Sequence, residues 1–270
     1  MTNTDANKSL LEVIDLSVTY KKAGRKIEIL KDVTFELKAR RTLGIVGESG
    51  SGKTVTALSV LKLIPSPPLH TLTGKVIFLG EDLLQLPEPQ MNRIRGNRIA
   101  YIFQEPATAL NPVLTIGDQI MEMILAHKAV SKKEAKERAI GLMTEVGIPS
   151  PALRMENYPH EISGGMRQRA MIAMALSCDP DILIADEPTT ALDVTIQAQV
   201  LELFKSLIET RGMSIIFMTH DLSVLAEIAD DVLVLKDGQV VEKKPIIQLF
   251  RYPSHPYTKE LISLVSGAVI

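Results

Sequence analysis

The most informative segment of this 270-residue chain is Gly47-Glu48-Ser49-Gly50-Ser51-Gly52-Lys53-Thr54, which has the pattern G-x-x-x-x-G-K-[ST] of a phosphate-binding loop. The apolar run at 42–46 before it is typical of a buried strand, and residues 54–64 after it predict a helix. The glycines let backbone N–H groups converge on one point, Lys53 can reach the β- and γ-phosphates, and the Thr54 hydroxyl can ligate Mg²⁺. We therefore expect the chain to bind a nucleoside triphosphate.

Composition limits the other functions open to the chain. Hydrophobic residues make up 46% and charged residues 23%, which is enough for a substantial core and argues against wholesale disorder. The net charge of -2 provides no excess of positive charge for nucleic acid, so no nucleic-acid partner is expected. No apolar run reaches the roughly 18 to 20 residues that span a bilayer, and the first nine residues are polar. We expect neither a membrane span nor a secretion signal.

The pattern of apolar residues predicts an α/β fold in four successive segments. Residues 1–86 should form an antiparallel β layer and the first part of a nucleotide-binding core, because β-rich runs follow one another there with almost no helical period. Residues 87–165 turn mainly helical and indicate an inserted subdomain. Residues 166–245 return to short buried strands alternating with helices, which favours a largely parallel sheet, and 246–270 form a tail.

A second element that handles phosphate and metal should accompany a genuine phosphate-binding loop. Residues 181–187, Asp-Ile-Leu-Ile-Ala-Asp-Glu, predict a buried strand that ends in two carboxylates. Asp186 is placed to hold Mg²⁺ or its water shell, and Glu187 could polarise the water that attacks the γ-phosphate. The competing interpretation is a solvated acidic turn that caps the next helix.

A third element lies between these two. Ser163 can cap the helix that follows it, and Gly164 and Gly165 let backbone amides approach an anion at the helix N-terminus. The chain therefore has two helix termini suited to phosphate.

Together these segments resemble the ATP-binding-cassette (ABC) ATPases over nearly the whole chain. Residues 47–54 look like the Walker A loop, 182–186 like the Walker B strand, and 163–165 like the family signature. The remaining matches are the Q-loop Gln104, the D-loop Ala191-Leu192-Asp193, the switch histidine His220 and the adenine-stacking Tyr20. The resemblance implies a P-loop NTPase with a RecA-like core, an antiparallel β subdomain and an inserted α-helical subdomain.

In that family, two such subunits face head to tail and sandwich two ATP molecules. The resemblance implies that Lys53, Thr54 and Asp186 serve the subunit's own ATP while the signature serves the partner's. Glu187 would be the general base, His220 would contact the γ-phosphate, and Gln104 would sense Mg²⁺ and link the site to the helical subdomain, which receives a membrane permease.

Within the family, the chain looks most like the ATPases of bacterial peptide and nickel importers. The signature departs from the usual one at Ile162 and Met166, but Gly-Gly-Met-Arg-Gln-Arg occurs in this branch, as do Tyr-Pro-His-Glu at 158–161 and the run His-Pro-Tyr-Thr-Lys-Glu-Leu at 255–261. Many peptide-importer members carry a cysteine-rich iron-sulfur element beyond this run. Cys178 is the only cysteine, so we expect no iron-sulfur cluster.

The resemblance thus implies an ATPase at the cytoplasmic face of a bacterial inner membrane. Its partners would be a second ABC ATPase, two transmembrane permease subunits and an extracytoplasmic substrate-binding protein. A heterodimer of ATPases is favoured by analogy and a homodimer stays possible. Import of dipeptides or oligopeptides is the first expectation, and a nickel or metallophore importer is the alternative.

Two other classes of protein stay open. A soluble ABC ATPase of DNA repair or translation usually has long coiled-coil insertions or a second cassette, and neither is evident here. A P-loop kinase would leave the signature and Gln104 unexplained.

Overall fold

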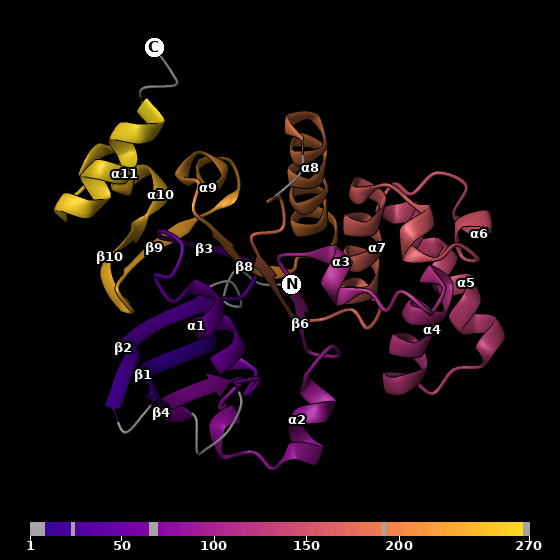
Figure 1. The fold of residues 1–270 in the computed structure, drawn as a ribbon, viewed down its shortest axis with the longest axis horizontal. Helices are drawn as coiled ribbons and strands as arrows, with labels where there is room; N and C mark the ends of the chain where they lie inside the picture. Colours follow the sequence, from indigo (N-terminus) through magenta and orange to yellow (C-terminus); the bar gives the residue numbers. More distant parts are fainter. Residues whose placement is uncertain (1–8, 23–24, 65–69, 191–192, 267–270) are drawn as a thin grey trace, which may run out of the picture. The chain divides into compact units, whose positions relative to one another are not determined.

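The computed structural model describes residues 9–22, 25–64, 70–190 and 193–266 (Figure 1). Contacts divide the chain into two compact units. Unit 1 comprises Met1–Met91 and Ser214–Ile270, and unit 2 comprises Asn92–Met213.

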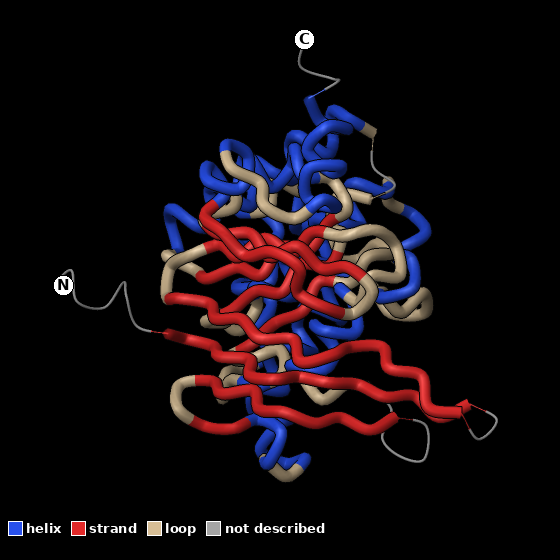
Figure 2. Tube along the Cα trace, turned by 90° about the vertical axis from the view of Figure 1, so that its left-hand side faces the viewer, coloured by secondary structure: helices blue, strands red, loops and turns tan. Residues whose placement is uncertain are grey.

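Unit 1 contains an antiparallel sheet of four strands in the order β2-β1-β4-β5, and its long strands run side by side in Figure 2. Along the first strand, Leu11 and Val13 are fully buried, and so are Leu16 and Val18 beyond a bulge at Asp15. Asp15 has a φ of 48°. Under strict two-residue alternation, Leu16 and Val18 would face the opposite side of the sheet from Leu11 and Val13, and the extra residue of the bulge keeps them on the buried side. The strands are β1 (Ser9–Lys22), β2 (Arg25–Lys38), β4 (His70–Phe78) and β5 (Glu81–Asp82).

The second sheet of unit 1 has the strand order β10-β9-β3-β8. β3 (Thr42–Val46) lies between β8 (Ser214–Thr219) and β9 (Asp231–Lys236), parallel to both, and β10 (Gln239–Pro245) pairs antiparallel with β9. Every residue of β3 and β8 is buried, which explains why these strands are continuous apolar runs without alternation. The helices of the unit are α1 (Lys53–Val60), α9 (Leu222–Ile228), α10 (Ile246–Arg251) and α11 (Pro256–Ser266), with a 3₁₀ turn η1 at Leu83–Gln85.

Unit 2 pairs two parallel strands, β6 (Ile99–Ile102) and β7 (Ile182–Asp186), with a group of helices. α7 (Gly164–Leu176) is the central helix of this group, because it contacts α3, α4, α5 and β6. These helices gather around α7 in Figure 1. The others are α3 (Pro106–Ala109), α4 (Ile116–His127), α5 (Lys132–Glu145), α6 (Pro151–Arg154), η2 (Pro159–Glu161) and α8 (Val194–Arg211), while α2 (Glu88–Ile94) contains the boundary between the units.

The predicted antiparallel layer, helical segments and parallel strands are all present. The Asp237-Gly238 pair makes the hairpin that such a pair predicts, with φ of 48° and 76° at the two residues. Among the described helices, none combines the length and apolar character required to traverse a bilayer.

Three elements differ from the sequence-based expectation. α1 ends at Val60 and not at Ile64, because Lys62 adopts a φ of 51° and closes the helix: its N–H and that of Leu63 donate to the Ser59 and Leu58 carbonyls. Within the stretch expected to form short β-rich runs, residues Arg25–Lys38 make one long strand, β2. The predominantly helical stretch also contains β6, which the apolar pattern did not reveal.

Candidate functional site

The phosphate-binding loop connects the carboxyl end of β3 to the first turn of α1. Gly50 and Gly52 have φ of 84° and 107°, a region that side chains other than glycine rarely adopt. At Gly47 a Cβ atom would lie 2.2 Å from the Leu235 carbonyl oxygen, so only glycine fits. The backbone conformation of the loop thus requires glycine at these three positions.

The Lys53 side chain is folded back inside this loop. It is 5% exposed, and its ammonium donates hydrogen bonds to the carbonyls of Gly47 at 2.7 Å and Glu48 at 3.1 Å. The Ser51 N–H also donates to the Glu48 carbonyl, at 3.1 Å. A buried cation surrounded by glycine-rich backbone fits a phosphate ligand, which would bring the negative charge that a buried ammonium favours.

The other residues of the loop differ in their exposure to solvent. Glu48, Ser49, Gly50 and Thr54 are exposed, whereas Ser51 and Gly52 are buried. The hydroxyl of Thr54, at the N-terminus of α1, is therefore accessible to a ligand that approaches the loop.

His220 directly follows β8, the parallel neighbour of β3. Val46 is paired with Thr219, so the residues that follow them, Gly47 and His220, leave the same edge of the sheet. His220 is exposed and lines a cavity of about 470 Å³ together with residues of α9 and α11, including Leu261 and Leu264. Unit 1 thus brings the phosphate-binding loop and the predicted switch histidine to one edge.

Tyr20 lies in the antiparallel sheet of the same unit. It is half-buried near the end of β1, opposite Ile27 of β2. Its role in stacking on adenine stays a prediction.

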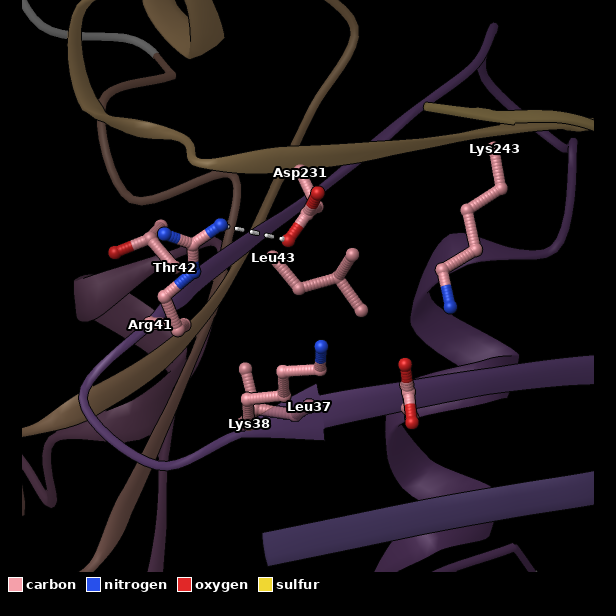
Figure 3. A pocket seen from close by; sticks show the side chains of 8 residues that line it. Leu37, Lys38, Arg41, Thr42, Leu43, Asp231 and Lys243 are labelled. Carbon is pink, nitrogen blue, oxygen red and sulfur yellow. Dashed lines mark hydrogen bonds and ion pairs between the residues drawn. The ribbon is translucent and has the colours of Figure 1, made fainter. Parts of the chain in front are cut away.

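A second, smaller cavity of unit 1 lies at the opposite end of β3 (Figure 3). It has a volume of about 80 Å³, and Arg41 at its edge forms ion pairs with Asp230 at 3.2 Å and Asp231 at 3.3 Å. Leu43 points into it, whereas the phosphate-binding loop follows the other end of the strand. No predicted site residue lines this cavity.

Unit 2 holds the two predicted carboxylates at the carboxyl end of β7. Asp186 is 2% exposed and accepts a hydrogen bond of 2.7 Å from the Tyr101 hydroxyl of β6. Burial, and then the negative charge of Asp186, raise the pKa of Tyr101, so the hydroxyl stays protonated and continues to donate. Tyr101 therefore fixes the orientation of the carboxylate.

Glu187 is held in an uncommon backbone conformation, with a φ of 45°. One carboxylate oxygen, Oε2, accepts hydrogen bonds from the Thr190 hydroxyl at 2.9 Å and from Gln104 Nε2 at 3.3 Å. The Glu187 carbonyl also accepts from the Thr190 N–H at 3.1 Å. The structure thus brings together two predicted site residues, Gln104 and Glu187, in one hydrogen-bonded group.

The predicted signature forms the start of α7. Ser163 caps the helix, and its hydroxyl accepts a hydrogen bond of 3.3 Å from the Met166 N–H. A Cβ atom at Gly164 would meet no atom within 4 Å, whereas one at Gly165 would lie 3.0 Å from Ile196. Ser163 and Gly164 are exposed at this terminus, as the residues of an anion-binding helix end should be.

Asp193 caps α8 in the same way, accepting a 2.9 Å hydrogen bond from the Ile196 N–H. The two D-loop residues before it, Ala191 and Leu192, lie outside the described residues. Within the described part of the chain, no group of three or more His, Cys, Asp and Glu side chains is arranged to hold a metal ion.

The predicted residues therefore form two sets, one in each unit. Tyr20, the loop at 47–54 and His220 belong to unit 1, and the others, Gln104, 163–165, Asp186, Glu187 and Asp193, belong to unit 2. Sequence reasoning missed three residues that touch these sets: Tyr101, Thr190 and Tyr257, whose hydroxyl accepts from the Glu48 N–H. All three act through side-chain hydrogen bonds that no spacing pattern encodes.

Comparison with known proteins identifies the class that this fold and these residues define. The chain matches the ABC transporter family over residues 30–190 and belongs to that family. It is therefore an ATP-binding ATPase subunit, as the motifs predicted.

Two curated relatives illustrate the match. The chain is 51% identical to the oligopeptide transport ATP-binding protein OppD of Bacillus subtilis strain 168, over 94% of this chain and 71% of the relative. It is 48% identical to the dipeptide transport ATP-binding protein DppD of the same organism, over 96% of this chain and 77% of the relative.

A solved structure confirms the predicted fold class. The ATP-binding cassette MJ0796, seen as a dimer in a post-hydrolysis state bound to ADP and Pi, superposes with a TM-score of 0.77 and 28% sequence identity. The match covers 87% of this chain and 98% of that one.

Proposed function

We propose that this protein is the ATP-hydrolysing subunit of a bacterial importer of dipeptides or oligopeptides. The observation that carries the proposal is identity of about one half, over nearly the whole chain, to relatives named for oligopeptide and dipeptide transport. The complete set of family motifs supports an active ATPase in that role.

In this proposal the loop at 47–54 binds the phosphates of ATP. Its amides and the Lys53 ammonium, which now bonds to loop carbonyls at 2.7 and 3.1 Å, would turn to the β- and γ-phosphate oxygens. Tyr20 would stack on the adenine ring.

The hydrolytic step would rest on Glu187. Its carboxylate accepts the proton of the water that attacks the γ-phosphate, and the hydrogen bonds from Thr190 and Gln104 keep it oriented for that task. His220, exposed at the edge of the parallel strands of unit 1, would contact the γ-phosphate.

Three residues are proposed to hold Mg²⁺. Thr54 offers an exposed hydroxyl, Asp186 a carboxylate and Gln104 a side-chain carbonyl, which are the oxygen ligands that this hard cation takes. When bound, Mg²⁺ neutralises charge on the phosphates. The Tyr101 hydrogen bond would keep the Asp186 carboxylate in place before the ion arrives.

The open start of α7 supports a role at a second subunit's nucleotide. We propose that Ser163, Gly164 and Gly165 serve the partner's ATP and that Asp193 contributes beside them. The partner is a second ABC ATPase, with a heterodimer favoured over a homodimer.

The remaining partners follow from the importer role. We propose that two transmembrane permease subunits bind the helical segment within residues 87–165 and that an extracytoplasmic binding protein delivers the cargo. The core would comprise residues 1–86 and 166–245, followed by the tail at 246–270. The protein would then work at the cytoplasmic face of the inner membrane.

Uptake in a deletion strain tests the proposal. The strain is complemented with wild type or Glu187→Gln and supplied with a labelled dipeptide, a labelled longer peptide or labelled nickel. Restoration of peptide uptake by wild type alone is expected. Restoration of nickel uptake only would replace peptide with metal as the cargo, and no rescue of any uptake would favour an ATPase outside transport.

A further inference from the structure

The phosphate-binding loop is in direct contact with a helix from the far end of the chain. Tyr257, in the first turn of α11, accepts a hydrogen bond of 2.9 Å from the backbone N–H of Glu48, 209 residues away. The tyrosine is 3% exposed, so water does not compete freely for this bond. Both residues belong to unit 1.

The ring and hydroxyl of Tyr257 are themselves held. The Lys236 ammonium, at the end of β9, lies 4.5 Å from the ring centroid in a cation–π contact. Burial raises the pKa of Tyr257 in spite of the opposing effect of the Glu48 amide, so the hydroxyl remains neutral at physiological pH. Its oxygen therefore acts as a steady acceptor.

The turn that leads into α11 is fixed from β10. The Glu242 carboxylate accepts from the N–H groups of Ser254 at 2.8 Å and His255 at 2.9 Å, and pairs with the Lys244 ammonium at 2.7 Å. His255 Nδ1 in turn accepts from the Tyr257 N–H at 3.2 Å. Tyr257 thus enters the helix at a defined place and does not depend on α11 packing alone.

The hydrogen bond to Tyr257 fixes the backbone N–H of Glu48, whose backbone carbonyl is already engaged. The carbonyl of Glu48 accepts from the Lys53 ammonium and the Ser51 N–H, both at 3.1 Å, while its N–H donates to the tyrosine. Release of the N–H would let the peptide before Glu48 rotate. The Gly47 carbonyl, to which Lys53 donates at 2.7 Å, belongs to that same peptide.

We propose that Tyr257 is a positioning residue of the phosphate-binding loop, which holds the Gly47–Glu48 peptide, and through it Lys53, in the geometry that receives the nucleotide phosphates. The C-terminal helix is on this account part of the nucleotide site's support. Tyr257 acts through the loop and does not touch the nucleotide.

The test compares Tyr257→Phe with Tyr252→Phe in the full-length protein. Tyr257→Phe removes the acceptor and keeps the ring, while Tyr252 is 72% exposed and serves as the matched control. We expect the affinity for ADP, measured by calorimetry, to fall about three- to tenfold in Tyr257→Phe, the effect of one lost hydrogen bond, and to stay unchanged in Tyr252→Phe.

Hydrogen exchange of the nucleotide-free protein provides the second measurement. The Glu48 amide should exchange faster in Tyr257→Phe, while amides in the middle of β3 keep the wild-type rate. Two results with a folded Tyr257→Phe protein would each overturn the proposal: an unchanged exchange rate of the Glu48 amide, or an unchanged affinity for ADP. Uniformly faster exchange across unit 1 would also overturn it, since it would assign to the tyrosine a role in general stability.

Glu242→Gln supplies a variant that leaves the tyrosine intact. Weakening the turn at 254–255 should loosen Tyr257 and reproduce the faster exchange of the Glu48 amide to a smaller degree. Wild-type exchange at Glu48 in this variant would contradict the part assigned to β10.

Discussion

Glu187 shows how single residues of this ATPase are prepared before nucleotide arrives. Its φ of 45° and the hydrogen bonds from Thr190 and Gln104 define the direction of its carboxylate. An exposed glutamate at a helix surface would sample several rotamers, and only a fraction of them would be productive. The strain in the backbone is consistent with a functional constraint at this position.

Replacement of Glu187 by glutamine keeps its shape and removes its basicity. We expect steady-state ATP hydrolysis to fall by at least about a hundredfold, because a general base contributes about that much or more, while ATP binding is retained. Phosphate release and equilibrium binding of ATP measure the two effects. Glu202→Gln, at a glutamate side chain that is 71% exposed in an ion pair with Lys205, is the control. Undiminished hydrolysis in Glu187→Gln would remove Glu187 as the base.

The Tyr101 hydroxyl donates a hydrogen bond to a charged and buried acceptor, so its removal should affect stability. We expect Tyr101→Phe to lower the free energy of unfolding by about 1.5–3 kcal/mol, the usual contribution of a hydrogen bond to a charged group. Urea denaturation followed by circular dichroism measures the change. A loss no larger than that of Tyr252→Phe would show that Asp186 does not depend on this donor.

The sequence allowed us to predict site residues that belong to contiguous motifs. It did not allow us to predict the residues that hold them in place through hydrogen bonds. Gly47–Thr54 and the Asp186-Glu187 pair are recognisable because phosphate and metal chemistry require fixed spacings. Tyr101 lies 85 positions before its partner Asp186, and Tyr257 lies 209 positions after Glu48. Only tertiary structure reveals such pairs.

At the scale of elements, strands and helices were predicted better than their ends. α4 and α5 fall inside the stretch at 87–165 that was predicted to be mainly helical, because amphipathic patterns of 12 and 14 residues are long enough to be unambiguous. The end of α1 was missed because Lys62 takes the left-handed position that glycine usually signals. β6 was missed because four residues, Ile-Ala-Tyr-Ile, are too few to show a period.

The stability of the contact between Glu242 of β10 and the turn before α11 should depend on pH. Burial alone would raise the pKa of Glu242, but the Lys244 hydrogen bond and the amides of His255 and Ser254 outweigh it and lower the value from 4.5 to about 2. Since the folded-state pKa is the lower one, the stabilisation is complete above about 4.5 and is lost as the pH falls toward 2.

Glu242→Gln should therefore be less stable than wild type at pH 7, and the difference should shrink between about pH 4.5 and 2. Unfolding free energies from urea titrations at several pH values measure this, with the exposed Glu81→Gln as control. A difference that stayed constant down to pH 3 would contradict the low pKa of Glu242.

At the scale of the whole molecule, the general class could be predicted from sequence and the arrangement of contacts could not. Alternating β and helical patterns with ordered phosphate motifs indicated an α/β ATPase, and the match to a solved cassette confirms it. The structure, however, assigns the motifs to two units, and unit 1 joins the first third of the chain to about the last fifth. The order and composition of the segments along the chain do not predict that its last part packs with its first part.

The single thiol of the chain provides a probe of unit 2. Cys178 follows the end of α7 by two residues and is 1% exposed. Its Sγ donates a hydrogen bond to the Met123 carbonyl at 3.6 Å. We expect a thiol reagent to modify the native protein very slowly and to titrate one thiol per chain once it unfolds. Labelling as a function of urea should follow the loss of helical signal. Fast native labelling would show that this part of the unit opens readily.

The β9–β10 hairpin limits how this protein can be engineered. A two-residue Asp-Gly turn is ordinarily a convenient place to insert an epitope or a fluorescent protein, because hairpin tips tolerate added chain. Here the Gly238 N–H donates to the Ser51 carbonyl at 3.0 Å, its carbonyl accepts from Lys31 at 2.9 Å, and a Cβ would lie 2.0 Å from the Ile29 carbonyl oxygen. A tag at this tip would push the phosphate-binding loop away from its neighbours. A reporter inserted there would therefore abolish the ATPase activity of the protein that carries it.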